Sequence, residues 1–166
     1  VMVFLPIVWA VLWRVARRYY HALGFRALAY FVASRGGTGA RGGFNIIHRG
    51  WQSEVRNAYI DEGWGERNVF APLVIARGAP VRWTDVTSQI VPDAEQQAFI
   101  DRMRAAELGD GYALPVFGPM GRNGFLAVGR PLTEQVLDEA PVEEMHMVAQ
   151  ATHMRLLQLL PERAHL

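Results

Sequence analysis

Large aromatic side chains recur at wide intervals between Trp51 and Trp83, and they are the residues of this chain best suited to chemistry. The stretch "WQSEVRNAYIDEGWGERN" contains Trp51, Tyr59 and Trp64 and ends in Asn68. Aromatic rings give a pocket rigid apolar walls, and the indole N–H and phenol O–H add polar contacts. The Asn amide can both donate and accept hydrogen bonds. The chemistry that these residues suggest is noncovalent recognition of a small molecule.

Residues for covalent or metal catalysis do not form a recognisable site. None of the three serines lies in a G-x-S-x-G turn, and the chain has no cysteine, which excludes thiolate catalysis, disulfides and cysteine metal sites. His146 and His153 share a helix face two turns apart, unlike a zinc-binding H-E-x-x-H pair. We interpret both as exposed or core-edge histidines. The glycine-rich "RGGTGARGG" lacks the lysine of a phosphate-binding loop. We expect no enzyme, no metal and no cofactor.

The composition indicates one domain with a substantial core. Of 166 residues, 51% are hydrophobic and 20% are charged, and the formal net charge of +1 argues against a nucleic-acid surface on this segment. All the basic residues are Arg, which we attribute to genome composition and not to phosphate recognition. We expect the acidic residues to lie on solvated helix faces, as at Glu54, Asp61, Glu62, Glu143 and Glu144.

The N-terminal apolar run ends at Trp13, and it is shorter than the about 18 to 20 residues that a membrane span requires. We predict a buried first helix from about Leu5 to Leu23, ended by Gly24. A surface-lying membrane helix is the alternative. Its apolar face is expected to contain residues at helical spacing, namely Phe4, Val8, Val11, Leu12, Val15, Tyr19 and Ala22.

Periodicity also predicts the elements that position the aromatic set. Strands are expected in "FRALAYFVAS" and "FNIIHR", separated by a loop in "SRGGTGARGG". A helix is expected in "WQSEVRNAYIDEG", where Trp51, Val55 and Tyr59 share one face. A short helical segment should follow in "NVFAPLVIARG", and "PVRWTDV" is expected to be extended.

The C-terminal half has the clearest patterns. "PDAEQQAFIDRMRAAEL" predicts a helix with Phe99, Met103 and Ala106 inward and Gly109 at its end. "GYALPVFGPMGRNGFLAVG" predicts a hairpin, and a long helix capped by Thr133 should break at Pro141. Because strands and helices do not alternate regularly, we predict an α+β fold with a mostly antiparallel sheet covered by helices on both faces.

The region from Trp51 to Gly129 resembles the autoinducer-binding domain of LuxR-type quorum-sensing regulators. In that family an aromatic is followed by Trp after four residues, Tyr after four more, Asp after nine and Trp after fifteen. This chain has Trp51, Val55, Tyr59, Asn68 and Trp83 at those positions, without a gap. "GYALP", "GPMG" and "GFLAVG" resemble the family's strand pair, and "LGFRALAYFV" resembles its first helix-to-strand passage.

The resemblance implies an α-β-α sandwich with a five-stranded antiparallel sheet. It also implies that an N-acyl-homoserine lactone binds between the sheet and the helices after the second strand. Three positions depart from the family. Val55 replaces a Trp that donates to the lactone carbonyl, Asn68 replaces an Asp that accepts the ligand amide N–H, and Ala127 stands where some members carry Ser or Thr. Site residues expected from the resemblance are Trp51, Val55, Tyr59, Asn68, Trp83 and Ala127.

Three functions are compatible with this pattern. The domain could sense an acyl-homoserine lactone through altered headgroup contacts, or be an orphan receptor for a non-lactone ligand, or be a ligand-free regulatory dimerisation domain. We expect residues 1–160 to form the ligand domain and 161–166 to begin a linker to a helix-turn-helix domain absent from this chain. A homodimer, a cytoplasmic location and DNA binding only through that absent domain are further expectations of the resemblance.

Overall fold

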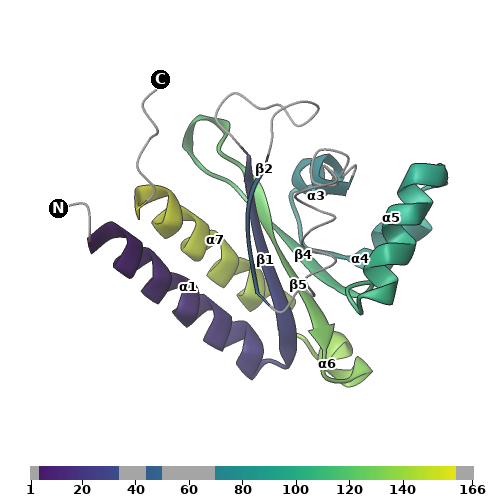
Figure 1. Ribbon diagram of the computed structural model, residues 1–166, viewed down its shortest axis with the longest axis horizontal. Helices are drawn as coiled ribbons and strands as arrows, with labels where there is room; N and C mark the ends of the chain where they lie inside the picture. The colour runs from purple at the N-terminus through teal and green to yellow at the C-terminus, as the bar shows by residue number, and fades with distance from the viewer. Residues whose placement is uncertain (1–3, 34–43, 50–69, 160–166) are drawn as a thin grey trace.

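The computed structural model describes residues 4–33, 44–49 and 70–159. The elements are α1 (Phe4–Ala22), β1 (Phe25–Ala33), β2 (Phe44–Arg49), α3 (Phe70–Arg77), β3 (Val81–Arg82), α4 (Trp83–Ser88), α5 (Ala94–Ala105), β4 (Gly111–Val116), the 3-10 turn η1 (Pro119–Gly121), β5 (Gly124–Pro131), α6 (Glu134–Asp138) and α7 (Val142–Leu159) (Figure 1). The loop predicted in "SRGGTGARGG" and the helix predicted in "WQSEVRNAYIDEG" lie outside the described residues.

One antiparallel sheet forms the middle of the molecule, with the strand order β2-β1-β5-β4-β3. Within the described ranges, β3 has only two residues, so four strands of six residues or more make up most of the sheet. The predicted hairpin is confirmed as β4 and β5, which pair from Gly111–Gly129 to Val116–Gly124. The α+β class is therefore confirmed.

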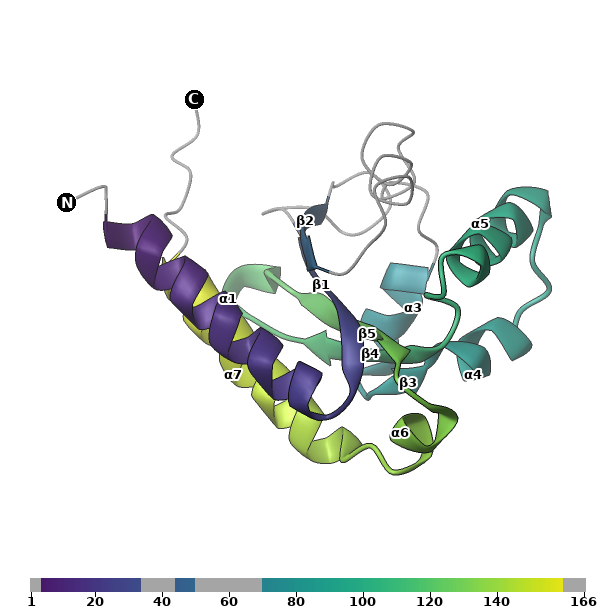
Figure 2. The same ribbon diagram turned by 60° about the horizontal axis from the view of Figure 1, so that its bottom comes forward.

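Helices cover both faces of this sheet, as predicted (Figure 2). α1 and α7 pack side by side on one face, while α3, α4 and α5 lie on the other. Since side chains alternate along a strand, Leu28, Tyr30 and Val32 enter the α1–α7 layer. The intervening Ala29 and Phe31 face the opposite layer. Each face thus has its own hydrophobic core.

The buried face of α1 differs from the predicted one. Trp13, Ala16 and Tyr20 are buried, and Tyr20 Oη donates to the Met145 carbonyl at 2.8 Å. Three valines of the predicted face are exposed instead, by 40% at Val8, 48% at Val11 and 58% at Val15. Apolar residues occupy several sides of this helix, so its periodicity is compatible with two different buried faces. The helix buries the face that carries Trp13 and Tyr20, because their larger rings remove more apolar area from water per residue.

α4 begins at Trp83, so the prediction of an extended "PVRWTDV" is wrong beyond Arg82. Its β-branched Thr and Val residues favour a strand locally. However, Thr87 Oγ1 donates to the Trp83 and Thr84 carbonyls, each at 3.2 Å, and this supports the helical turn.

α5 begins after a capping box, in which the side chains of Asp93 and Gln96 each accept a hydrogen bond from the other residue's backbone N–H.

α5 ends earlier than the predicted Gly109. Glu107 adopts the left-handed conformation with φ 59°. The Glu107 N–H then donates to the Arg104 carbonyl at 3.0 Å and the Leu108 N–H to the Met103 carbonyl at 2.8 Å. These paired bonds are a helix-ending motif that usually takes glycine at the left-handed position. The predicted break near Pro141 is confirmed by the division into α6 and α7. Thr133 precedes α6, but its side chain makes no capping bond.

Candidate functional site

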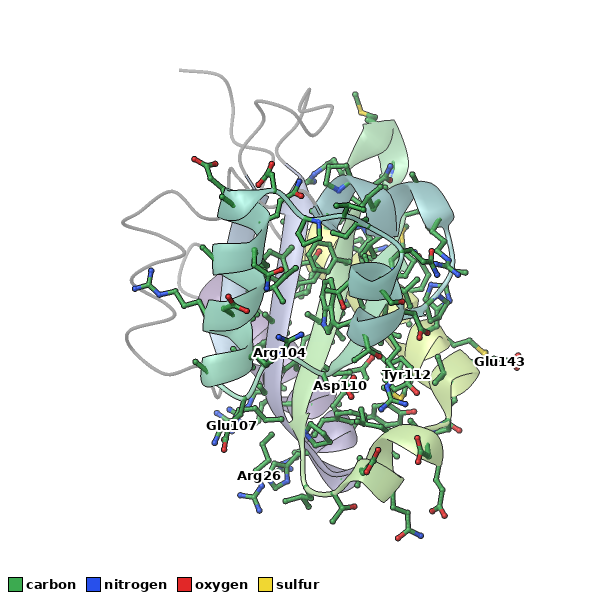
Figure 3. The ribbon with its side chains drawn as sticks, turned by 90° about the vertical axis from the view of Figure 1, so that its right-hand side faces the viewer. Arg26, Arg104, Glu107, Asp110, Tyr112 and Glu143 are labelled. Carbon is green, nitrogen blue, oxygen red and sulfur yellow. The ribbon has the colours of Figure 1, made fainter. Side chains whose placement is uncertain are left out.

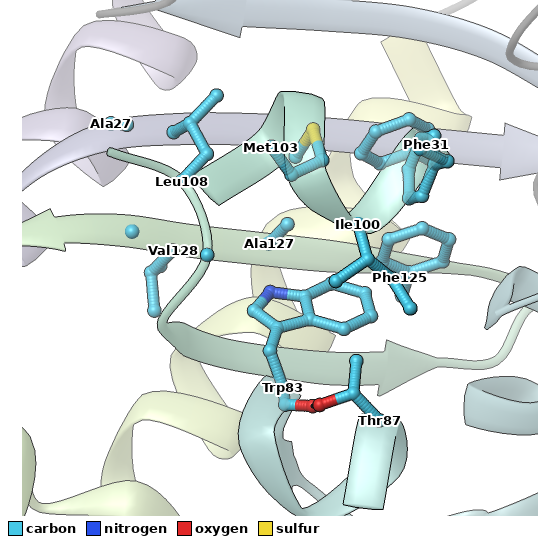
Figure 4. Close-up of a pocket in the computed structure, with 13 residues that line it drawn as sticks. Ala27, Phe31, Trp83, Thr87, Ile100, Met103, Leu108, Phe125, Ala127 and Val128 are labelled. Atoms are coloured by element: carbon cyan, nitrogen blue, oxygen red, sulfur yellow. The ribbon is translucent and has the colours of Figure 1, made fainter. Parts of the chain in front are cut away.

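A cavity of about 60 Å³ lies between the sheet and helices α4 and α5 (Figure 4). That volume is several times the roughly 10–15 Å³ that one water molecule needs. β1 and β5 supply its floor, α5 and the segment after it supply its roof, and Trp83 and Thr87 of α4 flank it. Its lining residues are Ala27, Phe31, Trp83, Thr87, Phe99, Ile100, Met103, Leu108, Gly109, Phe125, Ala127, Val128 and Gly129.

Three aromatic rings form one end of the cavity. Phe31 of β1 and Phe125 of β5 are direct cross-strand partners, and their rings stack with centroids 4.4 Å apart and an interplanar angle of 14°. Trp83 meets Phe125 edge-on, with centroids 6.3 Å apart and planes at 78°. Offset stacking and edge-to-face contacts are the favourable geometries for aromatic pairs. The three rings therefore make a rigid wall.

The side chains of the described residues give the cavity a mostly apolar lining. Among the residues that the structure describes, no Asp, Glu, Arg or His side chain lines the cavity, and the Thr87 hydroxyl already donates within its own helix. The described part of the site can therefore hold an apolar group, but it offers no charged partner for a headgroup. This agrees with Ala127, which has no hydroxyl and lies in the middle of the floor (Figure 4).

Ion pairs hold the segment that closes the cavity below α5. Asp110 accepts from Arg82, and Glu107 accepts from Arg130 Nη2 at 3.1 Å. Leu108 lies between these two acids in the sequence, and Figure 3 shows Glu107 just beyond the end of α5. The hydrogen bonds that Arg82 donates to the Asp110 carboxylate are the main reason that the pKa of Arg82 is raised, so the guanidinium keeps its positive charge. Leu108 itself is 6% exposed and packs with Ala27, Ala106 and Met103.

On the opposite face of the sheet, His153 is fully buried, so the prediction that it is exposed or at the core edge is wrong. Its Nε2 lies 2.8 Å from the Arg122 carbonyl, and its Nδ1 lies 2.5 Å from Tyr30 Oη. A carbonyl can only accept, so Nε2 carries the proton and Nδ1 accepts from Tyr30. Burial lowers the pKa of His153 to about 4, which keeps this ring neutral.

Two of the predicted site residues, Trp83 and Ala127, line the cavity together. The other four, Trp51, Val55, Tyr59 and Asn68, lie outside the described residues. Sequence reasoning missed Phe31 and Phe125, since their pairing depends on strand register. Phe99 and Met103 were predicted to face inward on their helix, but not to line a site.

Within the described ranges, no cluster of three or more His, Asp or Glu residues could hold a metal ion. The helices described there are also too short or too polar to span a membrane.

Residues 10–156 match the family model described as the autoinducer binding domain. The chain belongs to the autoinducer-binding domain family. The resemblance to LuxR-type quorum-sensing regulators is thereby confirmed, and the chain is a small-molecule signal-sensing domain. No curated protein matches it significantly in sequence.

Solved structures with a similar fold include the following two. One is the N-acylhomoserine lactone dependent LuxR family transcription factor CepR2 from Burkholderia cenocepacia, with a TM-score of 0.58 and 23% identity over 82% of this chain and 80% of CepR2. The other is SdiA from Escherichia coli, with a TM-score of 0.71 and 16% identity. That match covers 93% of this chain but only 63% of SdiA.

Proposed function

We propose that this domain binds an N-acyl-homoserine lactone or a related amphiphile in the cavity between the sheet and α4–α5, without catalysing a reaction. The observation that carries the proposal is the apolar cavity lined by both Trp83 and Ala127, two positions that the family resemblance assigned to the ligand. Burial of a hydrocarbon chain there would contribute roughly 0.8 kcal/mol per methylene.

An orphan receptor for a less polar or neutral-headed molecule is the second candidate. It is favoured by the absence of a charged side chain from the described cavity lining, and by the sequence changes at Val55, Asn68 and Ala127. An unpaired polar group in a dry pocket costs about 1–3 kcal/mol. A headgroup with fewer acceptors would lose less at such a site. A ligand-free regulatory dimerisation domain is the third candidate.

We also propose that two copies of the domain associate through the exposed stripe of α1. Val8, Val11 and Val15 recur one turn apart and are each at least 40% exposed. Arg14 and Arg18 are exposed on the same helix beside this stripe. An apolar patch rimmed by charge is typical of a protein interface. DNA binding through a further domain, and a cytoplasmic location, are proposals that rest on the family alone.

Thermal unfolding with added lactones tests the ligand proposal. The purified domain is heated alone, with each member of an acyl-homoserine lactone series, and with the matching ring-opened lactones and free fatty acids. A lactone at 100 times its dissociation constant should add about 2.7 kcal/mol of stability. Stabilisation by the fatty acids but not by the lactones would favour the orphan-receptor candidate. No stabilisation by any compound would favour the ligand-free candidate.

A further inference from the structure

One face of α7 bonds the backbone at the turn end of β4 through its side chains. Gln150 pairs with Phe117 in both directions, because its Nε2 donates to the Phe117 carbonyl at 2.7 Å and its Oε1 accepts from the Phe117 N–H at 2.9 Å. One turn earlier, His146 Nε2 lies 2.7 Å from the Pro115 carbonyl. A carbonyl can only accept, so this nitrogen carries the proton. Residues four apart share a helix face, and this face of α7 therefore follows the strand.

These bonds lie on a stretch of β4 that β3 does not cover. Within the described residues, β3 pairs with β4 only at Tyr112 and Ala113. Backbone groups at a sheet edge need partners other than a strand. Pro115 has no N–H, and the two side chains of α7 bond its carbonyl and both backbone groups of Phe117. α7 thus takes the place of a neighbouring strand along the second half of β4.

The same stretch of β4 lies behind the aromatic wall of the cavity. Pro115 lies opposite Phe125 on β5, and Phe125 lies opposite Phe31 on β1. These residues form one layer across three strands, in which the two Phe rings stack at 4.4 Å. α7 also bonds β1 here, because His153 accepts from Tyr30, the residue before Phe31. From the face opposite the cavity, α7 therefore holds the strands on both sides of β5.

The contact between α7 and the hairpin is close at Gly118. A Cβ at this position would lie 2.5 Å from Leu157 Cδ1 and 2.9 Å from His153 Nε2, and both of these residues belong to α7. The rest of the turn is open to solvent, since Phe117 is 39% exposed and Met120 is 69% exposed. α7 is therefore the helix that fixes the turn end of β4.

We propose that Gln150 and His146 are positioning residues of the ligand site, which hold β4 so that Phe125 keeps its place against Phe31. The proposal rests on the function proposed above. Both side chains lie outside the described cavity lining, so each acts on a ligand only through the strand. When their bonds are lost, the wall spends less time in its binding geometry, and the apparent affinity falls by the same fraction.

The test uses two pairs of variants. Gln150→Leu removes both bonds to Phe117 at nearly constant size, and Gln158→Leu is its matched control at an exposed position of the same helix. His146→Leu removes the bond to Pro115, whereas His146→Gln keeps an N–H donor there. Thermal melting shows which variants fold, and either pair tests the proposal without the other.

Two measurements are made on each variant. Isothermal titration with octanoyl-homoserine lactone gives the affinity. Carbon–proton NMR of the ligand-free domain follows the Cδ1 methyl of Ile100, which belongs to the same cavity lining and to the same core cluster as Phe31 and Phe125 (Figure 4). Aromatic rings shift the resonance of a nearby methyl, so this signal reports the position of the wall.

Both Leu variants at the bonding positions, Gln150→Leu and His146→Leu, should lower the lactone affinity about three- to tenfold, as expected for the loss of one or two hydrogen bonds. Both should also shift the Ile100 resonance. Gln158→Leu and His146→Gln should match the unmodified domain in both measurements.

The Ile100 resonance separates this inference from the proposed function. If the unmodified domain binds no lactone, a shift in Gln150→Leu but not in Gln158→Leu still supports the positioning of the wall by α7. An unshifted resonance in Gln150→Leu and His146→Leu would overturn the proposal, whether or not lactone binds. A shifted resonance with unchanged lactone affinity would also overturn it, because the position of the wall would then not matter to the ligand.

Discussion

Arg82 donates two hydrogen bonds to the carboxylate of Asp110, from Nε at 3.1 Å and from Nη2 at 2.9 Å. Arg82 directly precedes Trp83, and Asp110 follows the segment that carries Leu108. The pair therefore joins two walls of the cavity that come from different elements. Its planar two-point geometry is the strong form of an arginine–carboxylate interaction.

Asp110→Asn should loosen this junction. The substitution keeps an oxygen that can accept from the Gly111 N–H, now bonded at 2.8 Å, but it removes the charge that holds Arg82. Both side chains are partly exposed, at 25% and 32%, so solvent screening limits the expected loss of stability to about 1 kcal/mol. Thermal melting and titration with an acyl-homoserine lactone should both detect the change. Arg104→Ala, which removes the exposed Asp101–Arg104 pair at 3.7 Å, is the control and should alter neither.

Glu107→Gly should stabilise the domain even though it removes an ion pair. A left-handed conformation costs a non-glycine residue roughly 1–2 kcal/mol, and the exposed pair with Arg130 contributes at most about 1 kcal/mol. Glu107→Ala loses the ion pair without relieving the backbone, so it should be less stable than both other proteins. Chemical unfolding of the three proteins gives the order. A less stable Gly variant would mean that the ion pair outweighs the backbone strain.

Most of the described helices and strands were predicted, because their periodicity and turn motifs depend only on residues that are close together in the sequence. α5 was predicted from its 3.6-residue periodicity, and the β4–β5 hairpin from "RNG" between two apolar runs. α4 was missed because it has only six residues and its Thr and Val residues favour a strand. The buried face of α1 was assigned wrongly because apolar residues lie on more than one side of it.

The site likewise contains residues that were predicted from the sequence and residues that were not. Trp83 and Ala127 were predicted because spacing along the chain resembles a family. The floor could not be predicted, since it depends on the register of β1 against β5, which places Ala27 opposite Gly129 and Phe31 opposite Phe125. The burial of His153 was not predicted either, because its ring contacts Tyr30 and the Arg122 carbonyl, which are both far away in the sequence.

The buried His153 should make the domain less stable in mild acid. An unfolded histidine binds a proton near pH 6.5, whereas in the folded domain its pKa is lowered to about 4. Between these values the unfolded state binds more protons, so stability falls as pH decreases from about 6.5 to 4, by about 3 kcal/mol in all. Below pH 4 this group causes no further loss.

Unfolding free energies measured across that pH range test the assignment. His153→Gln is expected to be less stable at neutral pH, since it disturbs the contacts with Tyr30 and Arg122. Its stability should nevertheless vary less between pH 6.5 and 4 than that of the unmodified domain. Parallel pH profiles for the two proteins would contradict a buried, neutral His153.

Charge placed in the exposed α1 stripe should separate the two copies. Val11 and Val15 are 48% and 58% exposed, so Glu at either position should fit the isolated domain with little change in stability. In an interface the same carboxylate would be buried without a partner, and the dimer should weaken by tenfold or more. Sedimentation velocity over a concentration series measures this. Ala105→Glu, on the exposed side of α5, is the control, and an unchanged dimer in the Val15→Glu variant would exclude this face.

Asn68→Asp tests which polar group the ligand presents at the position where the family has its acid. If the ligand offers an amide N–H, a carboxylate accepts it in a charge-assisted hydrogen bond about twice as strong as the neutral one, and lactone affinity should rise. If the ligand offers an oxygen, Asn68 donates through its NH₂ group, and the carboxylate would remove that donor and repel the oxygen. Affinity should then fall. Isothermal titration with one acyl-homoserine lactone and with its matching fatty acid distinguishes a ligand amide N–H from a ligand oxygen at this position, because only the lactone contains an amide. Weaker lactone binding in the Asp variant would contradict the proposed lactone headgroup and favour a ligand with an acceptor at this point.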